Sequence, residues 1–116
     1  MNDRRIPHAI VDVVILDCLD CDASGVMPLY RDLIARSGCA PAVDLLLNML
    51  FAMTDDGMLK EFLPKGMSRA DALHAYIECL PKTSLGALSA DGIGVVYELT
   101  DRGRDELAAW RKSFQR

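Results

Sequence analysis

The stretch CAPAVDLLLNMLFAMTDDGML, residues 39–59, decides how the fold of this chain is predicted. Pro41 suits the first turn of a helix, and the apolar run behind it predicts that this helix continues to about Asp55. Gly57 supplies the turn that ends the helix. The whole stretch contains no Lys or Arg, so the polar side chains of this helix are acidic or neutral.

The stretch before it, SGVMPLYRDLIARSG at residues 24–38, predicts a helix that ends at its last glycine. Two helices joined by a glycine-containing turn form a helix-turn-helix, here over about residues 25–56. A further helix precedes this pair, because PHAIVDVVILDCLDCD begins with a proline and is apolar almost all round. A buried strand at residues 10–16 is the alternative, and we prefer the helix because the run is long.

The segments MLKEFL at about residues 58–63 and GVVYEL at about 94–99 have the pattern of strands. Residues 64–92 between them form an insertion that contains a helix, with Ser68 and Asp71 as a weak capping box at its start. Four apolar side chains share one face of that helix: Ala70, Leu73, Ile77 and Leu80.

A last helix is predicted at about residues 101–115, with Thr100 as its cap. Its inner stripe is Gly103, Leu107, Trp110 and Phe114, and we expect Gly103 to let the start of the helix pack closely against the preceding strand. The fold class is therefore α+β and mostly α, with three leading helices, two strands that carry a helical insertion between them, and a C-terminal helix.

The length of 116 residues predicts a single domain, 1–116, and the composition of 51% hydrophobic and 26% charged residues is ordinary for a globular protein. No apolar run reaches the roughly 18 residues that a membrane span needs. The N-terminus MNDRRIPH lacks the features of a secretory signal, so we expect a cytoplasmic protein without a membrane partner.

Charge is distributed unevenly along the chain. Residues 1–57 contain four basic and nine acidic residues, whereas residues 58–116 contain nine basic and eight acidic ones. A nucleic-acid-binding surface is usually basic. The half of the chain with the helix-turn-helix is the acidic half, which counts against DNA.

The segment YELTDRGRDELAAW resembles the junction between wing and helix in PadR-like and MarR-like winged-helix regulators. The matching positions are Tyr97, Leu99, Thr100, Gly103, Leu107 and Trp110. LLLNMLFAMTDDGMLKEF is similar to the recognition helix and first wing strand of the same families. The likeness covers about two thirds of the chain. It implies a winged helix, a transcriptional regulator that binds DNA through helix 41–55 and the wing, and a homodimer.

The chain departs from these families in two places. About thirty residues stand where the families have a short and often basic wing loop, and the predicted recognition helix begins with Ala-Pro-Ala-Val-Asp. Its polar stripe is Asp44, Asn48, Ala52 and Asp55, at spacings of 4, 4 and 3. Asn can pair with adenine, but two carboxylates oppose the attraction to phosphate that supplies most non-specific affinity.

Two functional hypotheses follow. In the first, the chain binds DNA through Asn48, with charge supplied by Arg31 and Arg36 on the preceding helix and by Lys60 and Lys65 on or near the wing. In the second, a diverged winged helix binds a protein partner and no DNA, with Leu46, Leu47 or Phe51 lying against the insertion or the partner. For the homodimer we expect an interface between the first and last helices, with these contributors: Ile10, Val14, Leu107, Trp110 and Phe114.

Cys18 and Cys21 have CxxC spacing, but no second pair of Cys or His residues completes a zinc site. A redox function is disfavoured as well, because the end of a helix and three nearby aspartates should raise the thiol pKa. His74 is expected at the surface. No nucleophile has an obvious base beside it and no phosphate or dinucleotide motif is present, so the sequence predicts no enzyme, no metal and no cofactor.

Overall fold

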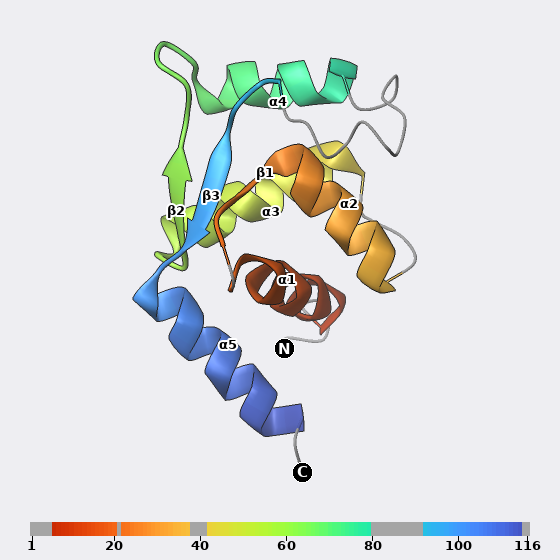
Figure 1. Cartoon of the computed structure of the whole chain (residues 1–116), viewed down its shortest axis with the longest axis vertical. Helices are drawn as coiled ribbons and strands as arrows, with labels where there is room; N and C mark the ends of the chain where they lie inside the picture. The colour runs from red at the N-terminus through yellow and green to blue at the C-terminus, as the bar shows by residue number, and fades with distance from the viewer. Residues whose placement is uncertain (1–5, 21, 38–41, 80–91, 115–116) are drawn as a thin grey trace.

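The computed structural model describes residues 6–20, 22–37, 42–79 and 92–114, except for the side chains of residues 6–12, 37 and 114. The elements follow in this order: α1 (Ile6–Leu19), β1 (Ser24–Gly25), α2 (Val26–Ser37), α3 (Val43–Asp55), β2 (Leu59–Phe62), α4 (Arg69–Cys79), β3 (Val96–Leu99) and α5 (Asp101–Phe114) (Figure 1). The described residues thus form five helices and a three-stranded sheet, which confirms the α+β, mostly helical class. The first apolar segment is a helix, as preferred.

The sheet is antiparallel, and β3 lies at its centre between β1 and β2. Leu59 pairs with Leu99 and Phe62 with Val96, while Ser24 pairs with Tyr97. The strand β1 was not predicted, because two residues cannot show the alternation by which strands are recognised in a sequence.

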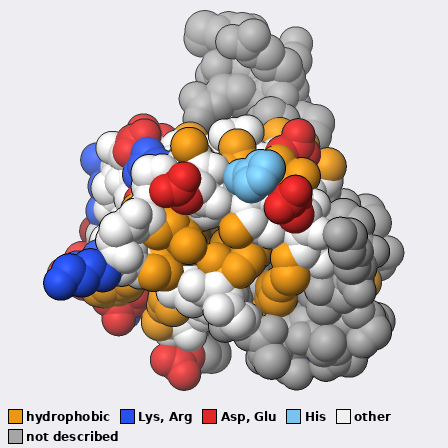
Figure 2. Space-filling view, turned by 90° about the horizontal axis from the view of Figure 1, so that it is seen from above, with side chains coloured by type: hydrophobic (Ala, Val, Ile, Leu, Met, Phe, Trp, Pro, Cys, Tyr) orange, Lys and Arg blue, Asp and Glu red, His pale blue; other side chains and the backbone are white. Residues whose placement is uncertain are grey.

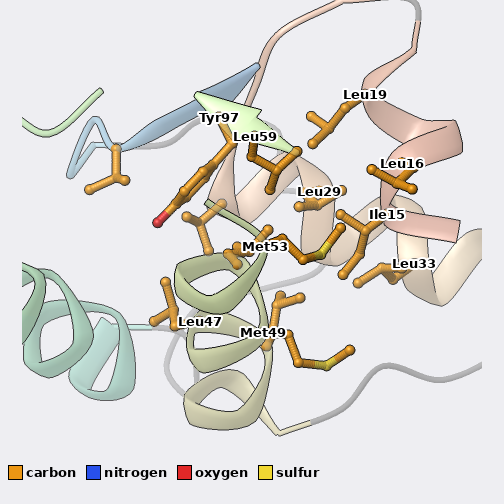
Figure 3. Packing of buried hydrophobic residues seen from close by; sticks show 14 of the residues in the cluster. Ile15, Leu16, Leu19, Leu29, Leu33, Leu47, Met49, Met53, Leu59 and Tyr97 are labelled. Atoms are coloured by element: carbon orange, nitrogen blue, oxygen red, sulfur yellow. The ribbon is translucent and has the colours of Figure 1, made fainter. Parts of the chain in front are cut away.

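The core lies between the sheet and the three leading helices (Figure 3). Leucines and an isoleucine of α1 and α2 meet the methionines of α3 and the inner side of the sheet, where Leu59 and Tyr97 are buried. The helix α3 has a second buried side, because Leu47 lies on the side that faces α4 (Figure 3). Two sides of α3 are therefore covered within the chain, one by the core and one by α4.

The helix α4 buries a different face from the one that its apolar spacing indicates. Ala72 and Tyr76 are fully buried, whereas Ala70 is exposed and Ile77 is 40% exposed. A segment far along the chain lies against this face, since the backbone N–H of Val95 donates to the Tyr76 hydroxyl at 3.4 Å. Apolar spacing alone does not identify the buried face, because α4 has apolar residues on two sides.

Leu73, the third member of the expected stripe, is half-buried, and Leu80 lies outside the described residues. The face of the molecule above α4 shows hydrophobic side chains at its centre, with carboxylates and a histidine around them (Figure 2).

The capping box at the start of α4 is confirmed. The N–H of Ser68 donates to the Asp71 carboxylate at 3.2 Å, and the N–H of Asp71 donates to the Ser68 hydroxyl at 3.1 Å.

The junction of β3 and α5 is built as expected from Thr100 and Gly103. The N–H of Gly103 donates to the Thr100 hydroxyl oxygen at 3.1 Å, and that hydroxyl donates to the carbonyl of Gly57 at 2.6 Å. A Cβ atom at Gly103 would lie 2.3 Å from the Met58 carbonyl oxygen and 2.6 Å from a methyl group of Leu99. Only a glycine lets the first turn of α5 lie this close to the sheet.

We predict that Gly103→Ala lowers the free energy of unfolding by about 1–3 kcal/mol, because the added methyl group overlaps backbone that cannot move aside. Helix propensity alone would give the opposite sign by about 1 kcal/mol. Urea unfolding measures the change. Gly92→Ala is the control, since a Cβ there meets nothing within 4 Å. A more stable Gly103→Ala variant would contradict the close contact.

Candidate interaction surface on helix α3

The polar stripe predicted on α3 faces solvent. Asp44, Asn48, Ala52 and Asp55 are all exposed, and so are Leu45 and Asp56. At 3.6 residues per turn, these six positions fall within an arc of roughly 120° on one side of the helix. We call this arc the outer face of α3. The remaining circumference is covered by the core and by α4.

One edge of the outer face is held by Arg69, the first residue of α4. Its guanidinium lies 3.0 Å from the carboxylate of Asp55 on α3 and 2.9 Å from that of Glu61 on β2. The same group lies over the ring of Phe51, 5.0 Å from the centroid. These two carboxylates raise the pKa of Arg69 further above its ordinary value, the hydrogen bond to Asp55 being the larger cause. The guanidinium of Arg69 is therefore paired with carboxylates of the same chain.

Tyr97 extends this network into the core. Its hydroxyl donates to the second oxygen of Glu61 at 2.7 Å, and the Glu61 side chain is only 10% exposed. Burial raises the pKa of Tyr97 well above the ordinary value near 10, and the hydrogen bond to Glu61 adds to this effect. Tyr97, Glu61, Arg69 and Asp55 thus connect β3, β2, α4 and α3 in one chain of contacts, which we call the Arg69 network.

The cations predicted to meet DNA are dispersed. Arg31 lies 3.7 Å from the carboxylate of Asp32, its neighbour on α2, and Arg36 binds Asp17 of α1. Lys60 is exposed on the outer side of β2, where its ammonium lies 5.6 Å from the ring centre of Phe62. Lys65 is exposed in the turn after β2. None of the four forms an ion pair with the outer face of α3 in the described part of the chain.

The residues predicted for a dimer interface lie along α1 and α5. Leu107 is buried within the single chain, whereas Val14 and Trp110 are half-buried. Trp110 lines a shallow hollow on α5 together with Glu106, Ala109 and Ser113. The side chains of Ile10 and Phe114 lie outside the described residues.

An ion-pair cluster holds α5 against α1. Arg111 of α5 binds Asp17 and lies 3.3 Å from the carboxylate of Asp20, while Arg36 of α2 also binds Asp17. Arg111, and after it Arg36, lowers the pKa of Asp17, and partial burial opposes them. Arg36 therefore joins α2 to α1. The sequence-based hypothesis had assigned it to a DNA-binding surface.

The thiol of Cys18 is half-buried, and its pKa is raised. The direction is the one expected, but burial is the main cause and the nearby aspartates contribute less. Cys21 and Cys39 lie outside the described residues, and Cys79 is half-buried. His74 is exposed, as expected, with Glu78 3.4 Å away. In the part of the chain that the structure describes, no group of His, Cys, Asp and Glu is arranged to hold a metal.

No function is predicted from the sequence for Arg69, Glu61 or Tyr97. The inward orientation of Glu61 could have been predicted, because it lies two residues after Leu59 in β2 and therefore shares the inner side of the sheet with it. An inward-facing carboxylate requires a partner. The sequence does not say that this partner begins a helix eight residues later.

Comparison of the chain with models of known protein families, with curated protein sequences and with solved structures gives no match. Within the described residues, no helix has both the length and the apolar character that crossing a membrane requires.

We predict that Tyr97→Phe weakens the loss of stability at alkaline pH. Above about pH 10, an unfolded chain loses the Tyr97 proton while the folded chain keeps it, so the free energy of unfolding falls as pH rises. This contribution is fully present below pH 10 and declines by up to about 1.4 kcal/mol per pH unit above it. The variant lacks the decline.

Urea unfolding between pH 7 and pH 11 provides the measurement. Tyr30→Phe, which removes the hydroxyl of a half-buried tyrosine outside the Arg69 network, is the matched control. The prediction fails if both variants change the pH dependence equally. At pH 7, Tyr97→Phe should cost about 1 kcal/mol for the lost hydrogen bond to Glu61.

Proposed function

We propose that this chain is a diverged winged-helix module that binds a protein partner and does not read DNA. The order α1, β1, α2, α3, β2, β3 and α5 supports the winged-helix assignment, with α3 in the place of a recognition helix and β2 and β3 as the wing strands. The likeness of the segments around Thr100 and Asn48 to PadR-like and MarR-like regulators points to the same architecture. In this proposal α4 is the helix of an insertion in the wing.

One observation carries the choice of a protein partner: the outer face of α3 is acidic, and Arg69, the cation at its edge, is bound to two carboxylates. DNA affinity depends on cations that replace the counterions of the phosphates. Asp44, Asp55 and Asp56 oppose that exchange at the surface that would enter the groove.

The position of α4 supports the same conclusion. A major groove about 12 Å wide admits a single α-helix, whose diameter with side chains is about 10–12 Å. Next to α3, α4 extends from the contact of Arg69 with Asp55 to the side occupied by Leu47 (Figure 3). A pair of helices packed about 8–10 Å apart is wider than the groove.

DNA binding is the second candidate function, and a specific observation favours it. Asn48 is exposed at the middle of the outer face, and Lys60 and Lys65 are exposed on β2 and the turn after it. Asn is a side chain that pairs with adenine in the major groove. A transcriptional regulator of this type would use the two lysines on phosphate.

Fluorescence anisotropy with a labelled random duplex of about 25 base pairs separates the two functions. We expect no binding at 25 mM salt and protein concentrations up to about 50 µM, because the phosphate attraction that is strongest at low salt lacks its cations on α3. Binding that disappears steeply with added salt would overturn the proposal. Asp44→Lys/Asp56→Lys tests the cause, since the added cations should create weak, salt-dependent binding.

We also propose that two copies associate through α1 and α5. The half-buried Trp110 beside its shallow hollow supports this arrangement, and so does the apolar character of α1. A cytoplasmic location and the absence of enzymatic activity stay predictions. The free thiol of Cys18 agrees with a reducing compartment.

Sedimentation velocity at about 20–50 µM should show a dimer, and Trp110→Ala should shift it toward the monomer because the indole supplies contact area. Lys112→Ala, an exposed change in the same turn of α5, is the control and should leave the dimer intact. A wild-type chain that sediments as a monomer at these concentrations would refute the association.

A further inference from the structure

The outer face of α3 combines an exposed apolar side chain with carboxylates on both sides of it. Leu45 is 42% exposed, one of three large hydrophobic side chains with this degree of exposure in the described residues. Asp44 precedes it at the start of α3, and Asp56 lies on the same side at the C-terminal end. Asn48 and Ala52 lie between these ends, so the surface is narrow and has no bulky polar group.

The charge of this face is not compensated within the described structure, except at its edge. Arg69 binds Asp55, but no ion pair between described residues includes Asp44 or Asp56. From Ser37 to Leu59 the sequence contains no Lys, Arg or His. The net effect is a negative surface around an exposed leucine.

The carboxylates at the C-terminal end of α3 act against the helix itself. A helix dipole places partial negative charge at its C-terminus, where carboxylates destabilise and cations stabilise. The last turn of α3 has no basic residue, while Asp55 ends the helix and Asp56 follows as its C-cap. Arg69 relieves Asp55. No ion pair between described residues includes Asp56, so its charge opposes the dipole of α3, and a cation from a partner would offset this effect.

We propose that the outer face of α3 binds a basic amphipathic helix of a partner protein, with an apolar side chain of that helix on Leu45 and Lys or Arg side chains near Asp44 and Asp56. The proposal rests on the protein-binding function inferred above and names the chemistry of the partner. The 13 residues of α3 extend over about 20 Å at 1.5 Å per residue. A partner helix of three to four turns matches this length.

Charge complementarity selects this occupant over the alternatives. An acidic or neutral helix would bring no cation to Asp56 and would leave the dipole of α3 uncompensated. A second copy of the same face would bring like charges together, because Asp44, Asp55 and Asp56 would meet their own counterparts across a two-fold axis. A basic helix satisfies both the leucine and the carboxylates.

The test uses the whole chain and a labelled 16-residue peptide of Leu, Ala and Lys, with Leu at helical spacing on one face and Lys on both sides of it. We expect micromolar binding by anisotropy at about 50 mM salt, and weaker binding as salt rises. The variant Asp44→Asn/Asp56→Asn should bind about fivefold or more weakly, as expected for the loss of two exposed ion pairs. Leu45→Ser should bind about tenfold more weakly, because the apolar contact is lost.

A matched control keeps net charge from mimicking this result. Glu98→Gln/Asp105→Asn likewise removes two negative charges, from exposed positions on β3 and α5, and should leave the affinity unchanged. Equal weakening by the control pair would reduce the effect to general attraction and overturn the proposal, and so would a peptide with Glu in place of Lys that binds equally well.

Stability measurements keep the variants interpretable and add an independent readout. Because Asp56→Asn removes a charge that opposes the helix dipole, its midpoint of thermal unfolding should equal or exceed that of the wild type. A lower midpoint would contradict the proposed conflict between charge and stability.

The two proposals fail separately: salt-dependent binding of duplex DNA refutes the protein-binding function, whereas absence of both DNA and peptide binding refutes the basic partner alone.

Discussion

The guanidinium of Arg69 holds together the part of this fold on which its surface depends. It reaches Asp55 at the end of α3 and Glu61 on the inner side of β2, and Glu61 in turn accepts the hydroxyl of Tyr97. A carboxylate that is 10% exposed is costly unless it is paired and hydrogen-bonded. The sheet therefore requires a cation at this point, and α4 supplies it with its first residue.

This requirement determines where α4 lies. Once Arg69 is bound between α3 and β2, the next turns of α4 must continue along α3, where Ala72 and Tyr76 become buried and Leu47 is covered (Figures 1 and 3). The helix is thus part of the core on one side. Its other side, with Ile77, remains at the surface. A helix placed by a polar contact in this way need not bury its most apolar stripe, so hydrophobic spacing alone does not identify the buried face.

The features that could be predicted from the sequence are those set by neighbouring residues. The capping box of Ser68 and Asp71, the cap at Thr100 and the close approach at Gly103 each depend on three or four consecutive positions and the strand beside them. The polar stripe of α3 was also predictable, because its spacing is a property of one helix. What could not be predicted are pairings between distant segments, such as Arg36 with Asp17 or Tyr97 with Glu61. In both cases the sequence contains both residues but does not show that they meet in the fold.

That difference decides how the surface of α3 is interpreted. An arginine near a recognition helix in sequence suggests a phosphate contact, yet Arg36 joins α2 to α1 and Arg69 joins α4 to α3 and β2. Freeing either one for a ligand would leave a carboxylate without its partner, and for Glu61 that carboxylate is nearly buried. Arg36 and Arg69 thus stabilise the fold, whereas no ion pair between described residues includes the outward carboxylate of Asp44 or that of Asp56. An exposed carboxylate such as Asp56, whose charge opposes the dipole of its own helix, is what a surface for a basic partner requires, and it is the opposite of what a phosphate backbone would select.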